Sequence, residues 1–291
     1  MILSYIKQKK VRNTSPLIES FLYSNMINMN YYIIFFGLLL SCQTGKLKVI
    51  GDISQSLTEV SAIETVSNSD LLWVIEDAGN QPNIYGLNTN GSVNASIHIS
   101  NAKNKDWEDL TTDSIGNLYV GDFGNNNKKR THFKIYKVEN LDLTNNKTTA
   151  KTINFKLPEN VKSQDFESFF LWKNTFYVFS KASKSCQVFK IPNQIGNHIA
   201  EFVSKYEFEG KKNKVTSADI SEDGKTVILL NHDKLWKLSQ FESDDFFSGK
   251  IEAHHFNHDS QKEGLCFKNK KDILITDESK KNSNIYLFSF N

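Results

Sequence analysis

The sequence predicts an all-β fold, a five-bladed β-propeller whose blades have four strands each. From about residue 57 onward, similar units recur at intervals of roughly fifty residues, which is the spacing of propeller blades. The recurring segments are rich in β-branched and aromatic residues, as buried strands are. No stretch of comparable length shows a helical period.

The third strand of each unit shows the repeat best. An apolar residue precedes an aromatic residue, and then a spacer and a second apolar residue follow. This pattern occurs five times, in Ile84–Leu87, Ile135–Val138, Val188–Ile191, Leu235–Leu238 and Ile285–Phe288.

The second strands agree with this frame. They follow segments with turn chemistry, such as Ser114–Asn117 and Glu222–Lys225. The five apolar segments expected as second strands are Leu72–Ile75, Leu118–Gly121, Phe176–Phe179, Val227–Leu230 and Ile273–Thr276.

The last unit ends after its third strand, at Phe290, and so lacks a fourth. The segment Leu47–Ile50, ahead of the first unit, is apolar enough to supply it. This pairing would close the ring and remove exposed sheet edges. We therefore expect one propeller over residues 46–291, with its last blade completed by an N-terminal strand.

The N-terminal segment predicts export. Tyr31–Leu40 is a short apolar run, too short to span a bilayer as a helix, and it leads into Leu39-Leu40-Ser41-Cys42. This arrangement resembles the lipobox of bacterial lipoproteins. The resemblance implies that residues 1–42 are an N-terminal extension and signal peptide ending at the lipobox cysteine, and that Cys42 carries a lipid.

Two details refine this prediction. Residues 1–28 fit a signal peptide poorly, and Met26 or Met29 would be a better start. Gln43 stands where an Asp would signal retention in the inner membrane, so we expect a lipid-anchored protein of the outer membrane. Whether it faces the periplasm or the surface stays open.

Composition limits the classes of function. The formal net charge is only +2, which gives no basic field for nucleic acid. We expect a monomer with buried, unbridged Cys186 and Cys266. The cluster His254, His255 and His258 lies mostly on an outer strand, where solvated histidines are expected rather than a zinc site.

In a propeller the first strands line the axial channel, and their starts lie on the same face as the ends of the second strands. Polar residues at the expected starts of the first strands therefore converge. Three glutamates on one ring repel one another unless protons or a cation intervene, and such oxygen ligands suit Ca²⁺. The candidate metal ligands are Ser61, Glu108, Glu167, Ser217 or Asp219, and Glu263.

The ends of the second strands form a wider ring on the same face. We expect Asp77, Asp122 and His232 to be candidates for activating water there. The remaining candidate ligand-binding residues are Asn80, Asn125, Arg130, Lys181, Asp277 and Glu278. Tight turns capped by Asp and Asn are the alternative interpretation of the acidic, Gly-containing segments.

The order Ser, Glu, Glu, Ser, Glu across the blades, and the turn Tyr119–Gly124, resemble those of the calcium-activated nucleotidases (apyrases). The resemblance covers the repeat frame and not continuous sequence. It implies that Ser61, Glu108, Glu167, Ser217 and Glu263 hold an axial Ca²⁺. The fourth blade departs from this order, because Ala218 aligns with the glutamates and Ser217 lies one residue early. This leaves Asp219 as a candidate ligand in place of Ser217. A full nucleotide-binding set is not matched.

Three functions remain open. The first is a membrane-anchored propeller that binds an unidentified small molecule or protein on one acidic face. The second is a Ca²⁺-dependent hydrolase of phosphate esters, in which Arg130 and Lys181 would neutralise the anion. The third is a structural ion without chemistry. The fold alone does not decide whether the protein is an enzyme.

Overall fold

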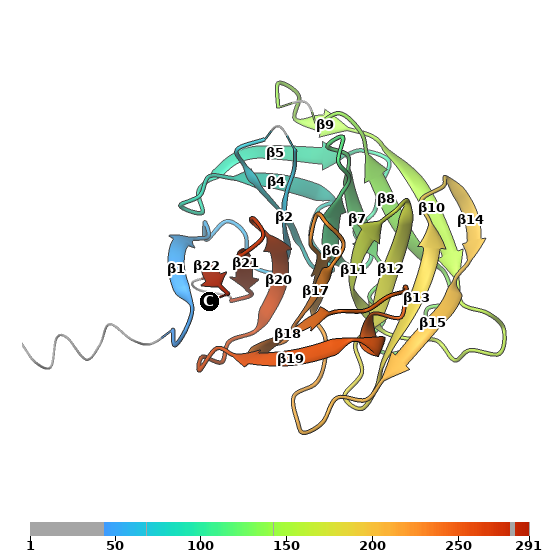
Figure 1. Ribbon diagram of the computed structural model, residues 1–291. Helices are drawn as coiled ribbons and strands as arrows, with labels where there is room; N and C mark the ends of the chain where they lie inside the picture. Colours follow the sequence, from blue (N-terminus) through green and yellow to red (C-terminus); the bar gives the residue numbers. More distant parts are fainter. Residues whose placement is uncertain (1–43, 68, 142, 280–282, 291) are drawn as a thin grey trace, which may run out of the picture. The chain divides into compact units, whose positions relative to one another are not determined.

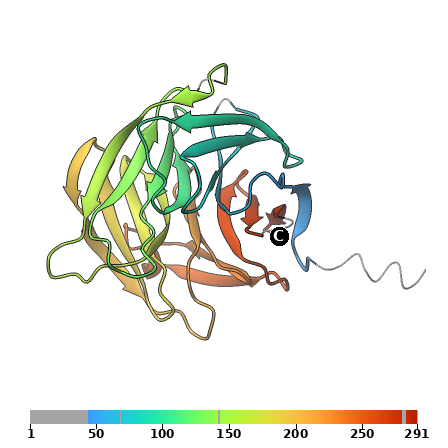
Figure 2. The same ribbon diagram turned by 180° about the vertical axis from the view of Figure 1, so that it is seen from behind.

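The computed structural model describes residues 44–67, 69–141, 143–279 and 283–290. The predicted extension, signal segment and Cys42 lie outside the described residues. Residues 44–291 form one compact unit, in which five sheets stand around a common axis (Figures 1 and 2). The predicted five-bladed propeller is confirmed.

Each blade runs from the axis outward in chain order. The innermost strands are β2 (Val60–Thr65), β6 (Trp107–Thr112), β11 (Phe166–Trp172), β16 (Ser217–Ile220) and β20 (Lys262–Phe267). The second strands are β3 (Leu72–Glu76), β7 (Leu118–Asp122), β12 (Thr175–Ser180), β17 (Thr226–Leu230) and β21 (Asp272–Asp277). The third strands are β4 (Asn83–Leu87), β8 (Phe133–Val138), β13 (Cys186–Pro192), β18 (Lys234–Ser239) and β22 (Asn284–Ser289). All the predicted second and third strands are therefore found.

The fourth strands are β5 (Val93–Ile99), β10 (Ala150–Lys156), β15 (Glu201–Tyr206), β19 (Lys250–His255) and, from the start of the described chain, β1 (Lys48–Asp52). β1 pairs antiparallel with β22, with Lys48 opposite Leu287. The predicted closure of the last blade by an N-terminal strand is thus confirmed. The pairing covers the edge of β22 that would otherwise be exposed.

Two blades gain a fifth, outer strand from the next blade. β9 (Lys147–Thr148) pairs in parallel with β5, and β14 (Gly196–Ile199) pairs in parallel with β10. A short 3₁₀-helix, η2 (Phe246–Ser248), precedes β19. These outer pairings join the first three blades at their rims and extend the four-stranded frame that the repeat predicts.

The hydrophobic core lies between neighbouring blades. Trp107 is fully buried there, packs against Tyr136 and donates its indole N–H to the Lys103 carbonyl oxygen. Trp107 thus acts as a structural wedge between two blades. Cys186 and Cys266 are buried and unbridged, as predicted.

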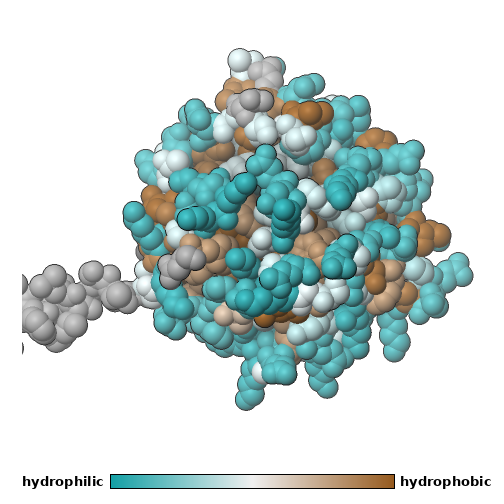
Figure 3. Space-filling view, in the orientation of Figure 1, coloured by the Kyte–Doolittle hydropathy of each residue, from teal (hydrophilic) through white to brown (hydrophobic). Residues whose placement is uncertain are grey.

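The face of the described residues that Figure 3 shows is mostly hydrophilic, with apolar residues scattered among the hydrophilic ones. In the part of the chain that the structure describes, no helix has the length and apolar character needed to cross a membrane.

Candidate functional site

The starts of the first strands share an irregularity that builds the site. In four blades the ladder between the first and second strand shifts register at the same position, and the residue in the shift is Ser61, Glu108, Glu167 or Glu263. A β-bulge redirects the side chain of its extra residue. Four of the predicted ligands therefore occupy equivalent positions at one mouth of the axial channel.

In the fourth blade the ladder of β16 with β17 begins at Ser217, opposite Leu230, so the ring position falls just before the strand. Thr216 stands at the equivalent position, and its Oγ1 donates to the Lys262 carbonyl oxygen at 2.8 Å. Ser61 Oγ likewise donates to the Trp107 carbonyl oxygen at 3.1 Å. The prediction of Ser217 or Asp219 at this level is wrong, because Ser217 pairs with Leu230 as Ala62 pairs with Ile75, one residue beyond the ring position, and Asp219 lies two residues further along the strand.

Ser217 and Asp219 have other surroundings. Ser217 lies one level down the channel, where its Oγ donates to Asp109 Oδ1 at 3.0 Å. Asp219 lies near the far end of the channel, where its carboxylate accepts the Phe267 N–H. Neither side chain belongs to the ring of glutamates at the first mouth.

Three carboxylates meet at that mouth. Asp77, Asp106 and Glu108 each offer an oxygen, and these oxygens all lie within 4.8 Å of one another. Asp77 follows β3, whereas Asp106 precedes β6 and Glu108 is its second residue, so the group joins two blades. Gly124 makes room for it, since a Cβ atom there would overlap Glu108 Oε1 and the Asp106 carboxyl group.

Asp106 was not among the predicted site residues. It lies two positions before Glu108, in the segment Asp106-Trp107-Glu108-Asp109. Residues two apart on a strand share a face, which is the signal that could have identified Asp106. Burial, with added repulsion from Asp77, raises the pKa of Asp106 to about 6.

The neighbouring glutamates, Glu108 and Glu167, are also buried, and the pKa of each is raised above its ordinary value. Burial and the Glu167 carboxyl group raise the pKa of Glu108. Burial raises the pKa of Glu167 to about 7, although the Lys181 ammonium opposes this effect. Lys181 lies 2.7 Å from Glu167 Oε2, whereas Glu167 Oε1 is buried and has no hydrogen-bond partner among the described residues.

Other members of the second ring complete the rim. His232 Nε2 lies 3.3 Å from Glu263 Oε1. Asn80 donates to Glu59 Oε2 at 3.2 Å and to the Asp77 carbonyl oxygen at 3.0 Å. Burial and the Glu263 carboxylate raise the pKa of Glu278 to about 7. The rim therefore carries an excess of carboxyl groups.

Asp277 has a structural role. Its carboxylate accepts the Tyr286 hydroxyl at 2.7 Å and the Asn284 N–H at 2.7 Å. These bonds hold the end of β21 to the start of β22. The contacts of Asp277 therefore indicate a structural role and not the ligand-binding role that the sequence predicts.

Asp122, Asn125 and Arg130 hold the loop after β7. Arg130 Nη2 lies 2.7 Å from Asp122 Oδ1, and its Nη1 donates to the Gly124 carbonyl oxygen at 3.2 Å. Asn125 donates to the Gln164 carbonyl oxygen at 2.8 Å and accepts the Arg130 N–H at 2.8 Å. These three predicted site residues thus stabilise the loop that brings Gly124 over Glu108.

A cavity of about 480 Å³ adjoins the carboxylates. It is lined by Asp106, Gly124 and the Asn125–Asn127 segment, and by the side chains of Lys105, Lys129 and Arg130. The face therefore combines an acidic centre with a cavity large enough for a small ligand.

Comparison with known proteins supports the fold alone. No family model and no curated protein matches the sequence. One similar solved structure is the β-propeller domain of Cps50 (Swd1) from Myceliophteria thermophila, with 8% identity, 84% of this chain and 100% of that chain covered, and a TM-score of 0.48. Another is a glucose dehydrogenase, with 6% identity, 84% and 99% covered, and a TM-score of 0.51. The chain is a β-propeller protein, and its resemblance to apyrases stays a prediction.

Proposed function

We propose that this propeller binds a divalent cation, Ca²⁺ by preference, at the channel mouth, and uses that acidic face to bind a ligand. The observation that carries the proposal is the grouping of Asp77, Asp106 and Glu108, whose carboxylate oxygens lie within 4.8 Å of one another. Three like charges so close are unfavourable unless protonated or bound to a cation.

A cation would also satisfy a carboxylate oxygen that the lysine of this site does not contact. Lys181 compensates Glu167 through Oε2, but Glu167 Oε1 stays buried without a partner in the described chain. Bound Ca²⁺ takes six to eight oxygen ligands in flexible geometry, and carboxylates with water molecules supply them. Asp77, Asp106, Glu108 and Glu167 would provide the protein ligands in this proposal.

The ligand would occupy the cavity beside Asp106. Lys105 and Lys129 line it, and no ion pair of either is found among the described residues. A partly anionic small molecule or an acidic protein segment would satisfy both the lysines and an adjacent cation. Export and a lipid on Cys42 belong to the same proposal and would place the propeller at the outer membrane.

Calorimetric titration of Ca²⁺ into purified residues 46–291 tests the cation site. We expect saturable binding, and a rise in melting temperature on adding Ca²⁺ to EGTA-treated protein. Glu108→Gln and Asp106→Asn should abolish both effects. Glu252→Gln, on the outer strand β19, is the matched control and should bind Ca²⁺ normally. Absence of any melting shift and of binding heat would refute the proposal.

A screen of phosphate esters with Ca²⁺ separates binding from hydrolysis. Asp122 and Arg130 are paired with each other and Lys181 with Glu167, so one proposed water-activating group and both proposed anion-binding groups are already engaged. We therefore expect Ca²⁺ binding without turnover. Turnover that Glu108→Gln removes would replace the binding proposal with the hydrolase, and a melting shift without any captured ligand would favour a structural ion.

Lipidation is tested separately in cells. Cells that express the full chain should incorporate labelled palmitate into the protein. The Cys42→Ser substitution should prevent this labelling and release the protein from membranes. Equal labelling of Cys42→Ser would remove the lipid anchor from the proposal and leave the cation site untouched.

A further inference from the structure

A second cavity lies at the opposite end of the axial channel, where the first strands end. Its volume is about 630 Å³, within the range of about 300–1,000 Å³ typical of small-molecule sites. Its walls are residues 64–67, 111–114, 171–174, 219–222 and Phe267, which lie at the ends of the first strands and in the turns that follow them. None of the residues proposed to hold Ca²⁺ lines it, so the two sites are separate.

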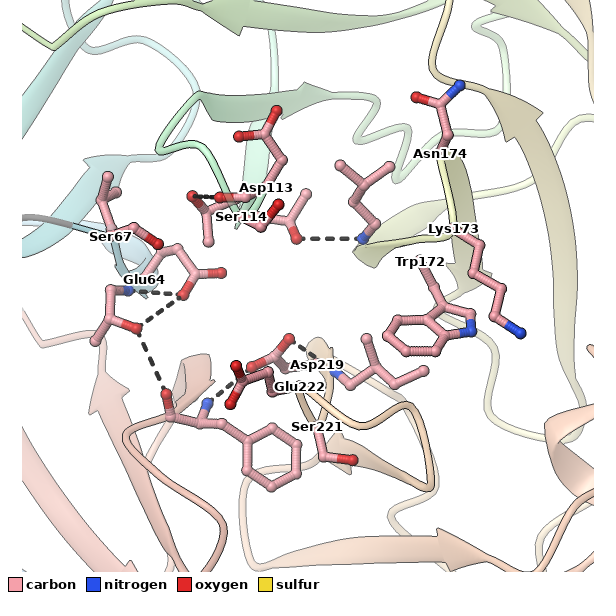
Figure 4. A pocket seen from close by; sticks show the side chains of 17 residues that line it. Glu64, Ser67, Asp113, Ser114, Trp172, Lys173, Asn174, Asp219, Ser221 and Glu222 are labelled. Carbon is pink, nitrogen blue, oxygen red and sulfur yellow. Dashed lines mark hydrogen bonds between the residues drawn. The ribbon is translucent and has the colours of Figure 1, made fainter.

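Two carboxyl groups, from Glu64 and Asp219, point into this cavity (Figure 4). Glu64 is 4% exposed, and its Oε1 accepts the Thr65 N–H at 2.7 Å, whereas Oε2 has no hydrogen-bond partner among the described residues. Asp219 accepts the Ile220 N–H and the Phe267 N–H, each at 2.7 Å. These bonds fix both carboxyl groups at the floor of the cavity.

Positive charge is missing from this floor. In the described ranges no ion pair involves Glu64 or Asp219, or Asp109 behind them. The lysine of the wall, Lys173, turns its ammonium away from the centre of the cavity, over the ring of Trp172 at 5.6 Å. An unpaired, buried carboxylate is costly, and either a proton or a ligand cation would relieve that cost.

The wall opposite Glu64 is aromatic. Trp172 lies across the cavity from Glu64 (Figure 4). The turn carrying Gly224 packs on the indole, because a Cβ atom at Gly224 would overlap the ring. The turn therefore holds the indole in place at the cavity. An aromatic face attracts a cation and also packs against a carbon chain.

The arrangement suits an organic cation better than a metal ion. Among the described residues, three ligand atoms close enough for one metal ion occur at Asp77, Asp106 and Glu108 and not at this floor. We propose that the cavity binds a small amine or guanidinium compound, with its charged group at Glu64 and Asp219 and its carbon chain against Trp172. Charge-assisted hydrogen bonds would supply the affinity.

Calorimetric titration of residues 46–291 in EGTA tests this with agmatine, which carries both an amine and a guanidinium group. We expect saturable binding of agmatine and none of butane-1,4-diol, a neutral chain of similar length. Glu64→Gln should weaken binding by about tenfold or more. Trp172→Leu should weaken it by a smaller factor, and Glu108→Gln, at the other mouth, should leave it unchanged.

Several outcomes would overturn the proposal. The first is that about 10 mM agmatine gives no heat of binding. The others are that the diol binds equally well, that Glu64→Gln binds agmatine with unchanged affinity, or that Mg²⁺ displaces agmatine. Circular dichroism melts of each variant separate lost binding from lost folding. If Glu64→Gln does not fold, Asp219→Asn and Trp172→Leu decide the matter in its place.

Discussion

The Lys181 ammonium lies 2.7 Å from Oε2 of Glu167, a carboxylate that is almost completely buried at the mouth of the channel. Burial would lower the pKa of Lys181, but Glu167 and Glu263 raise it above its ordinary value. The pair thus joins the end of β12 to the start of β11 electrostatically. It makes Lys181 a group that stabilises the acidic site rather than a free anion-binding lysine.

Removing the ammonium should therefore destabilise the protein in a way that a cation reverses. We expect Lys181→Met to lower the free energy of unfolding in EGTA by about 3 kcal/mol, because breaking a buried pair leaves an uncompensated charge. Urea denaturation with and without Ca²⁺ measures this, and Ca²⁺ should restore part of the loss. Lys205→Met, from an exposed ion pair with Glu207, should change stability by less than about 0.5 kcal/mol. Equal effects of the two substitutions would contradict this view.

Gly124 gives a test of the geometry of the carboxylate group. A Cβ atom at Gly124 would overlap Glu108 Oε1 and Asp106, so Gly124→Ala should move both carboxylates apart. We expect Ca²⁺ affinity to fall by about tenfold or more in calorimetric titration. Gly210→Ala is the control, because a Cβ there meets no atom within 4 Å and the change only adds backbone strain. Normal affinity in Gly124→Ala would show that Glu108 does not bind the ion in this position.

The floor of the second cavity predicts an unusual pH dependence. Burial raises the pKa of Asp219 to about 7, far above that of an unfolded aspartate. Between about pH 4 and pH 7 the folded protein therefore binds more protons than the unfolded chain, and its stability falls as pH rises. Thermal melts in EGTA should show a higher melting temperature at pH 5 than at pH 8. Groups that titrate or carry charge around this floor are Glu64, Asp109, Asp113, Lys173, Asp219 and Glu222.

A substitution isolates the contribution of Asp219 to this slope. Asp219→Asn cannot ionise, so its melting temperature should vary less between pH 5 and pH 8 than that of the unsubstituted protein. Glu252→Gln, exposed on β19, should keep the original slope. An identical slope in Asp219→Asn would mean that other carboxyl groups govern the effect.

Closure of the ring predicts a dependence on the first described strand. A chain that begins at Ile53 lacks β1 and leaves the edge of β22 unpaired. We expect it to melt several degrees lower and to self-associate, as exposed strand edges do. Light scattering and thermal melts compare it with a chain that begins at Thr44. A monomer of unchanged stability would show that the pairing of β1 with β22 contributes little.

The sequence by itself determined the fold of this protein. Five recurrences of the pattern at Ile84–Leu87 and its equivalents predict the blades, because buried strands need a run of β-branched and aromatic residues. The missing fourth strand after Phe290 and the spare strand at Leu47–Ile50 predict closure. Both inferences depend on local composition and on counting, which a linear sequence contains in full.

The tertiary structure alone decided the detail of the sites. Bulges at Ser61, Glu108, Glu167 and Glu263 set which residue of each first strand reaches the ring, and in the fourth blade that residue is Thr216 instead of Ser217. The shift depends on backbone pairing across the sheet, for which the side-chain pattern carries no signal. The cavity at Glu64 and Asp219 arises likewise only when five strand ends, distant in sequence, meet around one axis.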